Sequence, residues 1–312
     1  MSMFIRLVKE EELDVADLVL RLAFGTQDGL KDPLQSFGDR DMLKARWKGR
    51  TSTVLVAEEE GAIVGTTVIT KWGSIGFFGR MAVKPDCWGR GIASQLTEAA
   101  VKLFDEWHVS VAGLDTFPDS SKHIQLYQKF DFWPRFLTAI LVKQVKTQDG
   151  SVDFSTFSNL SVEQRERFLE QTIDLTNSIY RGLDVSAEIE SVHSQSLGDT
   201  VLVTDRNELA CFAVCHCGKN TEAGSDRCYI KFGGINPSHS PNSFQKLLGA
   251  CEAYARKQGV GRLMAGINTG RKDAYRVMLR YGFRVSLLKV TMHRPNQPAY
   301  DAPEVFVMDR WS

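Results

Sequence analysis

The chain has 312 residues, of which 43% are hydrophobic and 24% are charged, as in an ordinary globular protein. Thirty-eight basic residues balance thirty-eight acidic ones, which excludes the positive excess of a dedicated nucleic-acid-binding protein. The N-terminus has no cationic stretch followed by an apolar one, and no apolar run approaches the roughly 18 residues that span a bilayer. We therefore expect a cytoplasmic protein with neither nucleic acid nor membrane as a partner. The sequence leaves its oligomeric state open.

The first half of the chain begins with a strand and helices and continues with an antiparallel hairpin. The β-branched run Thr53–Val56 is followed by a polar turn at Glu58–Gly61 and by a second apolar run, which is a hairpin pattern. A strand ending at Met81–Pro85 and a long helix with one apolar face come next. A further strand, a short helix ending at Tyr127–Phe132 and a last strand complete a mixed α/β unit. The apolar face of the long helix is formed by Ile92, Leu96, Ala99, Ala100, Leu103, Phe104 and Trp107.

The second half repeats this order of elements. Thr200–Val203 has the same four letters as Thr53–Val56 and also begins a hairpin. Gly233–Pro237 precedes a long apolar-faced helix, as Met81–Pro85 does in the first half. Met278–Phe283 repeats the aromatic ending of the short helix. The order of matching segments predicts a duplication of one fold.

A polar segment separates the two copies. Lys146–Phe157 contains a glycine and few apolar residues, as domain boundaries often do. The sequence therefore predicts two mixed-sheet α/β domains, one at residues 1–147 and the other at 152–312.

A glycine-rich loop lies between the third strand and the long helix of the first copy. Cys87–Ser94 read CWGRGIAS, so the loop leads into a helix N-terminus, where unpaired N–H groups and the helix dipole favour a phosphate. Gly89 and Gly91 let the backbone approach such an anion, Ala93 keeps the first turn slim, and Arg90 can add a positive charge. The pattern predicts a site for a pyrophosphate.

Two other phosphate-binding loops fit the sequence less well. A dinucleotide-binding loop needs a third glycine, where this chain has Ser94, and it follows a parallel crossover rather than a hairpin. A nucleoside triphosphate loop needs a Gly-Lys-Ser/Thr ending, which does not follow here. A Gly-rich turn can also be a plain helix cap.

Met81–Phe104 together with Leu114–Phe132 resembles the GNAT family of N-acetyltransferases. The family motif Q/R-x-x-G-x-G/A is matched by Gly91 and Ala93, although its first position is Trp88 here. The resemblance implies acetyl-CoA as co-substrate, with its pyrophosphate on the backbone N–H groups of the loop and its pantetheine arm along the preceding strand. The residues implied in binding are Met81, Ala82, Val83, Trp88, Gly89, Arg90, Gly91, Ile92, Ala93, Ser94 and Ser121.

The resemblance also implies an acid for the leaving thiolate. Leu126–Phe132 read LYQKFDF, so Tyr127 stands where many family members have a catalytic tyrosine. The alternative is that Tyr127 is only a core aromatic. A tyrosine with a pKa of about 10 is protonated at neutral pH and can donate. Asp131 replaces the usual glycine of this motif, and Ser121 replaces an asparagine that contacts the pantetheine arm.

The general base is left open by the sequence. Asp115 on the next strand and Glu58 and Glu59 near the hairpin turn are candidates, and a chain of waters or an amine that arrives neutral would also serve. The acceptor is expected to meet the first helices and their loop, Phe24–Trp47. The aspartates of that segment could attract a cationic amine, but they are equally typical of turns: Asp28, Asp32, Asp39 and Asp41.

The second copy has lost the features that suggest chemistry. Its loop, Ser238–Lys246, has no glycine, Pro241 removes a backbone donor, and Met278 stands in the position of Tyr127. We therefore expect one catalytic copy and one degenerate copy, acting as an acetyl-CoA-dependent N-acetyltransferase on a primary amine of a small molecule. A non-catalytic acyl-CoA-binding or regulatory protein is the alternative, favoured by the departures at Trp88, Ser121 and Asp131.

A group of cysteines in the second copy could suggest a metal site. Cys211, Cys215 and Cys217 are separated by even steps in a strand-like run, with Cys228 farther on and His216 among them. Such spacing places the cysteines on one face, and no C-x-x-C pair is present. The pattern favours small buried hydrophobic side chains over a zinc site, so no metal is expected.

Overall fold

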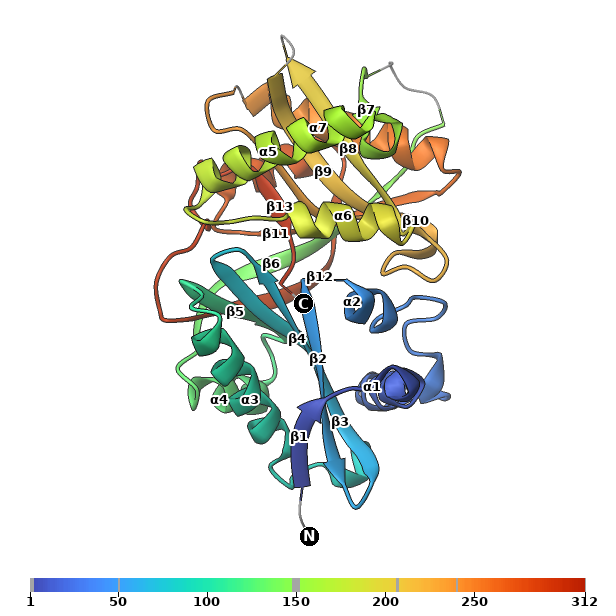
Figure 1. Ribbon diagram of the computed structural model, residues 1–312, viewed down its shortest axis with the longest axis vertical. Coiled ribbons are helices and arrows are strands. Elements are labelled where there is room, and N and C mark those ends of the chain that lie inside the picture. The colour runs from blue at the N-terminus through green and yellow to red at the C-terminus, as the bar shows by residue number, and fades with distance from the viewer. Residues whose placement is uncertain (1–2, 50, 148–151, 206–207, 240, 312) are drawn as a thin grey trace.

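The computed structural model describes residues 3–49, 51–147, 152–205, 208–239 and 241–311, which form two lobes joined by a continuous sheet (Figure 1). The thirteen strands of these residues belong to one mixed sheet. The mixed α/β class predicted from the sequence is confirmed. Within the described ranges, no helix has the length and the apolar character needed to cross a membrane.

The first half follows the predicted order of strand, helices, hairpin, strand, long helix, strand, short helix and strand. Its elements are β1 (Met3–Leu7), α1 (Leu13–Gln27), α2 (Lys44–Lys48), β2 (Ser52–Glu59), β3 (Ala62–Trp72), β4 (Ile75–Val83), α3 (Ile92–Glu106), β5 (Val111–Thr116), α4 (Ser121–Gln128) and β6 (Trp133–Gln144).

The second half repeats that order and adds a short strand in the C-terminal tail. Its elements are β7 (Ser155–Thr156), α5 (Val162–Ile179), α6 (Ser186–Ser194), β8 (Gly198–Asp205), β9 (Glu208–Gly218), β10 (Gly224–Ile235), α7 (Pro241–Lys257), β11 (Arg262–Asn268), α8 (Lys272–Arg280), β12 (Arg284–Arg294) and β13 (Val307–Asp309).

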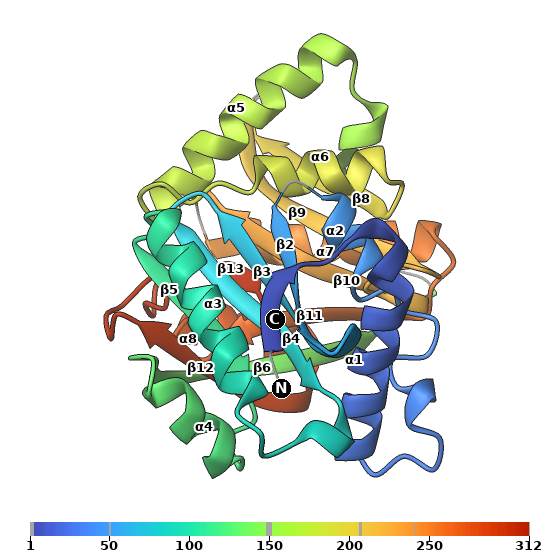
Figure 2. The same ribbon diagram turned by 60° about the horizontal axis from the view of Figure 1, so that its bottom comes forward.

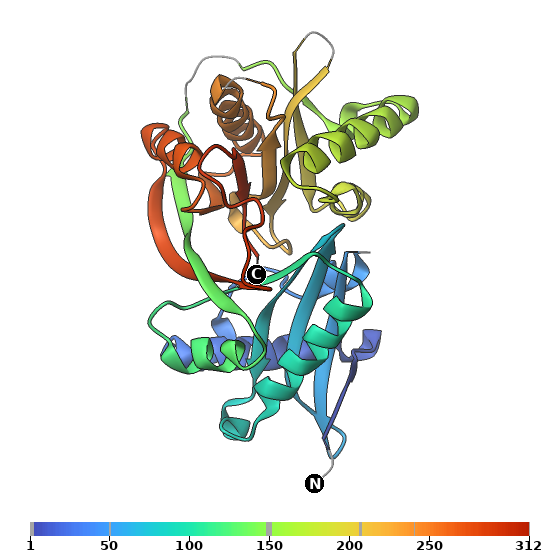
Figure 3. The same cartoon turned by 90° about the vertical axis from the view of Figure 1, so that its left-hand side faces the viewer.

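The two halves exchange their last strands. β6 leaves the first half and pairs with β11 of the second, whereas β12 leaves the second half and pairs with β5 of the first. β6 and β12 also pair with each other, and Figure 3 shows green β6 and red β12 running side by side between the lobes. Each lobe therefore contains a strand from the other half. The ranges 1–147 and 152–312 stay a prediction, and residues 148–151 of the expected boundary lie outside the described residues.

In the first lobe, helices cover both faces of the sheet because successive strand residues point to opposite faces. Val54 and Val56 of β2 pack in one core cluster with α1, whereas Leu55 and Ala57 pack in another with α3. Figure 2 shows α1 and α3 on opposite sides of the strands. The sheet is thus held rigidly between two helices at the place where β4 ends and α3 begins.

The second lobe is built in the same way. Cys211 and Cys215 of β9 belong to the apolar cluster that contains α7, and the alternate residues Phe212 and Val214 belong to the cluster on the other face, with α5 and α6. Cys228 is fully buried in the first of these clusters as well. Cys217 is partly buried against the same cluster, so the predicted burial is confirmed for Cys211, Cys215 and Cys228 and only in part for Cys217.

The lobes share an apolar core at their junction. Trp72 and Phe77 of the first half belong to the same buried cluster as Phe232 of the second half. The rings of Trp72 and Phe232 lie edge to face with their centroids 5.6 Å apart. Since burial of aromatic surface is the largest favourable contribution to such contacts, the lobes are expected to stay fixed to each other.

Candidate functional site

Strands β4 and β5 separate at the centre of the first lobe. They pair in parallel only from Ile75 to Phe77, opposite Val111 to Gly113. Beyond this point β5 continues to pair with β12, and β4 continues to pair with β3. The separation leaves a space between two strands that are each anchored on their outer side.

An irregularity in β4 lies beside this space. Thr66 pairs with Ala82 and Val68 pairs with Gly79, so two residues of β4, Arg80 and Met81, oppose a single residue of β3. Arg80 has a positive φ of 52°, which is uncommon for a residue with a side chain. Such strained positions gather at functional sites, where a bulge re-aims a side chain.

The predicted loop leads from β4 into α3. Gly89 and Gly91 both have φ of 80°, a conformation that favours glycine, and a Cβ at either position would meet no atom within 4 Å. Among the described residues, the backbone N–H groups from Gly89 to Ala93 have no acceptor, whereas that of Ser94 donates to the Gly91 carbonyl at 3.1 Å. Five unpaired donors at the positive end of a 15-residue helix form an anion-binding surface.

Two side chains of the loop have partners that differ from those expected. Arg90 pairs with Glu59 at 2.5 Å and does not line the cavity described below. Trp88 lines that cavity, and its indole N–H donates to the Val83 carbonyl at 2.7 Å. The Trp88 ring is thus hydrogen-bonded to the last residue of β4. Trp88 occupies the motif position where the family has a glutamine or an arginine.

A cavity of about 650 Å³ lies along the end of β4 and the start of α3. A volume of this size suits a cofactor-sized ligand. It brings together every predicted binding residue except Arg90, and also the predicted acid Tyr127. The predicted residues that line it are Met81, Ala82, Val83, Trp88, Gly89, Gly91, Ile92, Ala93, Ser94, Ser121 and Tyr127.

Tyr127 of α4 lines this cavity. Its ring packs edge to face on Phe78, with the centroids 5.7 Å apart, and its hydroxyl has no hydrogen-bond partner among the described residues. Burial raises the pKa of Tyr127 to about 12, so the phenol stays protonated at neutral pH. The side chain has both the packing of a core aromatic and the free hydroxyl of a proton donor.

A second, smaller cavity of about 110 Å³ adjoins the first on the other side of Tyr127. Its wall includes Asp115 of β5 and Lys289 of β12, together with Arg80 and Arg310. The residues that line both cavities are Phe24, Gln27, Met81, His123 and Tyr127. The predicted acceptor segment contributes Phe24, Gln27, Phe37 and Met42 to this cavity.

Burial shifts the pKa of two ionisable groups that line this cavity, Asp115 on β5 and Lys289 on β12. Desolvation raises the pKa of Asp115 to about 6, although a hydrogen bond of 2.7 Å from the Thr291 hydroxyl lowers it. The second carboxylate oxygen of Asp115 is buried and has no partner among the described residues. Desolvation and the charge of Arg310 lower the pKa of Lys289 to about 7. A carboxylate with a pKa near 6 is ionised at neutral pH yet can accept a proton.

The other acids that the sequence offered are engaged elsewhere. Glu58 pairs with Arg6 and Glu59 with Arg90. None of the four aspartates of the expected acceptor segment lines the smaller cavity. Asp41, for example, accepts from three backbone N–H groups at the start of α2, which is helix capping. The sequence did not identify Lys289 or Arg310, because strand exchange brings Lys289 to this half and the C-terminal tail brings Arg310 to it.

In the second half the C-terminal tail occupies the place that corresponds to the larger cavity. β13 pairs with β10 at Phe232 to Gly234, and the Ile235 N–H donates to the Phe306 carbonyl at 3.3 Å. These residues of β10 correspond to the end of β4. A tail strand therefore uses the backbone donors and acceptors that the first copy leaves open.

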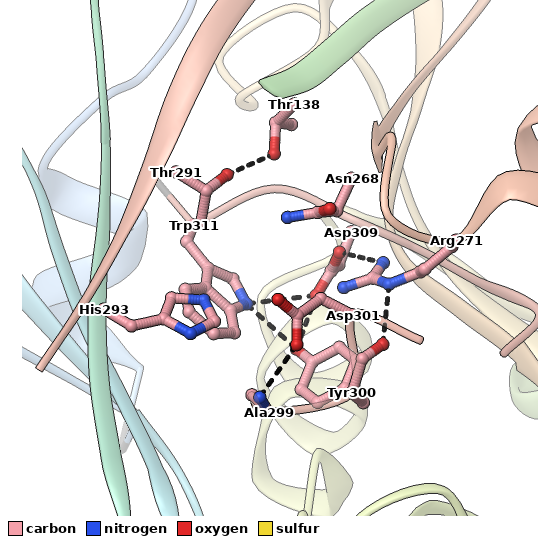
Figure 4. A pocket seen from close by; sticks show the side chains of 10 residues that line it. All are labelled: Thr138, Asn268, Arg271, Thr291, His293, Ala299, Tyr300, Asp301, Asp309 and Trp311. Carbon is pink, nitrogen blue, oxygen red and sulfur yellow. Dashed lines mark hydrogen bonds and ion pairs between the residues drawn. The ribbon is translucent and has the colours of Figure 1, made fainter. Parts of the chain in front are cut away.

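The tail is anchored by a buried polar cluster at the junction of the lobes (Figure 4). Asp309 accepts from Arg271 and from the hydroxyl of Tyr300, both at 2.5 Å, and Trp311 donates to Asp309 at 3.0 Å. The space between these side chains is only about 10 Å³, the size of one water, so the cluster is a structural junction. It fixes the residues on either side of Arg310.

Residues 25–132 match the model of the acetyltransferase (GNAT) family. Three solved structures share the fold over nearly the whole chain. A Pyrococcus horikoshii protein described as an acetyltransferase superposes with a TM-score of 0.69 at 14% identity, covering 99% of this chain and 95% of that one. A tandem GNAT protein from the clavulanic acid biosynthesis pathway gives 0.59 at 12% identity, covering 96% and 99%. A Sphaerobacter thermophilus N-acetyltransferase gives 0.58 at 13%, covering 96% of each chain. No curated protein matches the chain in sequence.

The first half of the chain therefore contains a GNAT domain. The similarity to a tandem GNAT protein over both halves agrees with the duplication predicted from the sequence. Members of this family transfer acyl groups from an acyl-CoA to an acceptor, and acyl transfer is the chemistry that the family match supports here.

Proposed function

We propose that the chain is an acetyl-CoA-dependent N-acetyltransferase that acts on a primary amine of a small molecule. The observation that carries this proposal is the pair of adjoining cavities with Tyr127 between them. One cavity has unpaired backbone donors at a helix N-terminus, as a CoA pyrophosphate requires. The other has a carboxylate that can take a proton from an ammonium.

In the first cavity, the N–H groups from Gly89 to Ala93 would hold the pyrophosphate, and the free inner edge of β4 from Met81 to Val83 would hold the pantetheine arm. Because β4 and β5 have separated at this point, the backbone groups of Met81 are not used by a neighbouring strand on that side. Ser121, at the start of α4, lies across the cavity from this edge.

For the chemistry, we assign Asp115 as the general base and Tyr127 as the general acid. The ammonium loses one proton to Asp115, and the nitrogen lone pair of the resulting amine attacks the thioester carbonyl carbon. A carbon–nitrogen bond forms, the carbon–sulfur bond breaks, and the leaving thiolate takes the proton of the Tyr127 hydroxyl. The second proton on the new amide nitrogen then passes to the Tyr127 phenolate and restores the phenol. The raised pKa of Asp115 and the protonated state of Tyr127 are the states that these roles need.

The second half is proposed to be structural. Its loop lacks glycines, and the tail strand pairs with β10 where a pantetheine arm would pair in the first half. Its contribution to the reaction is then indirect, through the residues of β12 and the tail that line the smaller cavity.

Turnover of acetyl-CoA with a panel of small primary amines, followed by free thiol release, tests the proposal. Thiol release that depends on an amine and yields the N-acetyl product supports it. Binding of acetyl-CoA by calorimetry without amine-dependent release from any member of the panel would instead favour a non-catalytic acyl-CoA-binding protein, which the departures at Trp88 and Asp131 also suit.

A further inference from the structure

We propose that the acceptor of this site carries an oxyanion, a carboxylate or a phosphate, next to its amine, and that this group binds to Arg80, Lys289 and Arg310 in the smaller cavity. This inference rests on the proposed function, because it names the class of amine that the same site accepts. It differs from one alternative that the sequence left open, in which the aspartates of Phe24–Trp47 attract a cationic amine.

The smaller cavity is lined by two arginines, one lysine and one carboxylate. Burial lowers the pKa of Lys289 to about 7, so this lysine is partly protonated at neutral pH and gains charge when an anion binds beside it. The side chain of Arg80 is only 9% exposed, and its Nη1 is buried without a partner among the described residues. The Nε of Arg310 is likewise buried and unpaired there. A buried donor without an acceptor is costly, so two of them at one cavity point to a missing acceptor.

The carboxylates around these cations are already shared. Among the described residues, Glu222 is the one carboxylate that pairs with Arg80, at 2.6 Å, and it also pairs with Arg46 at 2.9 Å and with Lys231 at 2.6 Å. Asp115, the carboxylate in the cavity wall, accepts from Thr291 and has the raised pKa of a poorly compensated acid. The positive charge at the cavity therefore exceeds the negative charge that faces it.

Repulsion between neighbouring cations contributes to the lowered pKa values of two arginines. Burial, with the neighbouring charge of Arg46, lowers the pKa of Arg80 to about 10. Burial and the charges of Arg227 and Arg310 lower the pKa of Arg40, which lies over the ring of Phe37 in the cavity wall, to about 10. An oxyanion bound among these groups would remove part of this repulsion and would gain charge-assisted hydrogen bonds.

The cationic group is rigidly built. Arg310 lies between Asp309, which pairs with Arg271, and Trp311, whose ring stacks on His293 with the centroids 4.9 Å apart. A Cβ on Gly113 of β5 would come within 2.1 Å of the Trp311 ring, so the glycine makes room for the tail. The backbone on both sides of Arg310 is thus fixed against the sheet of the first lobe.

The small volume of the cavity favours a small acceptor. Asp115, proposed to take the proton of the amine, lines the same cavity of about 110 Å³ as Arg80, Lys289 and Arg310. Amine and oxyanion must then belong to one small molecule, separated by a few bonds. An amino acid or an aminoalkyl phosphate has an amine and an oxyanion at this separation. The planar guanidinium of arginine can donate two hydrogen bonds to a carboxylate or to a phosphate.

The test uses pairs of amines that share a skeleton and differ in the anionic group. β-Alanine is compared with its amide, and phosphoethanolamine with ethanolamine, with thiol release and product measured at saturating acetyl-CoA. We expect the anionic member of at least one pair to have a kcat/KM about 10- to 100-fold higher, as expected for a lost hydrogen bond to a charged group. The pair with the larger ratio identifies carboxylate or phosphate.

Variants then assign the effect to the cationic residues. Arg310→Gln and Lys289→Gln should raise the KM for the anionic acceptor about 10-fold or more with little change in kcat, and should leave the neutral partner unaffected. Arg310→Lys should restore part of the preference. Lys102→Gln removes an exposed lysine that pairs with Glu98 on α3 and is the matched control for charge.

The possible results separate this inference from the proposed function. Equal or better use of the neutral amines, or equal losses for both members of a pair in Arg310→Gln, would overturn the inference while the enzyme stays an N-acetyltransferase. If no amine of either kind is acetylated, the proposed function fails. Calorimetric titration of β-alanine and phosphoethanolamine in the presence of CoA then tests the anion site alone. The anion site is supported if wild type binds either compound and Arg310→Gln weakens that binding. It is refuted if wild type binds neither compound or if Arg310→Gln binds them as wild type does.

Discussion

Tyr127 is the residue on which the proposed chemistry depends most directly. Tyr127→Phe keeps the ring that packs on Phe78 and removes only the hydroxyl. General acids contribute about 10²- to 10⁴-fold, and a thiol is already a fair leaving group, so we expect kcat to fall about 100-fold with acetyl-CoA affinity little changed. Steady-state and single-turnover rates measure the effect.

The control for Tyr127→Phe is Tyr275→Phe on α8, a tyrosine of the second half outside both cavities. It should have full activity. Because burial raises the pKa of Tyr127 to about 12, the rate should not fall from loss of this proton until well above pH 10. An unchanged kcat in Tyr127→Phe, with chemistry shown to be rate-limiting, would make Tyr127 a core aromatic and nothing more.

Asp115 should determine the acidic limb of the pH–rate profile. Activity is expected to rise with pH through about 6, the pKa to which burial raises this carboxyl, because only the ionised form accepts a proton. Asp115→Asn keeps an oxygen that can accept from Thr291 but cannot act as a base. The variant should lose about 100-fold or more in kcat/KM together with the limb near pH 6.

The same substitution should stabilise the fold. Since the folded pKa of Asp115 lies above its unfolded value, the carboxyl favours folding when protonated, and this contribution is lost as pH rises through about 6. At pH 8, Asp115→Asn should therefore raise the free energy of unfolding by on the order of 1–2 kcal/mol, measured by urea titration. A variant that is less stable than wild type at pH 8 yet equal to it at pH 5 would contradict this assignment.

The site residues that could be predicted are those that act within one half. The loop residues and Tyr127 follow from local motifs, and Asp115 could be named as a candidate because it ends a strand of that half. Lys289 and Arg310 could not be found in this way. Each is an ordinary basic residue in its own segment, and only the pairing of β12 with β5 and of β13 with β10 brings both to the same cavity.

At the scale of elements, the start of α3 should decide where acetyl-CoA binds. Gly91→Glu places a negative charge on a surface of unpaired N–H groups and at a φ of 80° that a side chain disfavours. We expect calorimetry to detect no acetyl-CoA binding. Gly91→Asn tolerates this φ without adding charge, so it should retain partial affinity and separates the two causes.

The control for Gly91→Glu is Ser243→Glu, at the corresponding place near the start of α7. It should leave binding unchanged, because Pro241 has no N–H and β13 already pairs with β10. Equal losses from both substitutions would mean that the second half also binds the co-substrate, and would refute the assignment of a single site.

The order of elements was predictable but their pairing was not. Apolar periodicity identifies the hairpins β2–β3 and β8–β9 because their partners are neighbours in the chain. β6 and β12 each follow a short helix and have similar apolar runs, so either could complete either sheet. The choice depends on contacts between residues about 150 positions apart, such as Thr138 with Thr291, which no local pattern records.

The whole molecule should unfold as one unit, because its halves share strands, an apolar core and buried charges. Arg46 and Arg80 of the first half pair with Glu222 of the second, which is almost fully buried. Breaking such a pair leaves an uncompensated charge and typically costs about 3–5 kcal/mol. Neither half is therefore expected to be stable alone, although each contains every element of the fold in sequence.

Deletion of residues 303–312 tests this cooperativity. The deletion removes β13 from β10, takes Asp309 away from the buried guanidinium of Arg271, and removes Trp311 from its packing on Phe77 in the first lobe. Because the tail contacts both lobes, we expect the whole chain to melt in one transition, lowered by on the order of 10 °C in calorimetry. Arg310→Gln, which leaves the tail anchored, is the control and should melt within about 2 °C of wild type. Two separate transitions, or a truncated chain as stable as the full one, would show that the lobes fold independently.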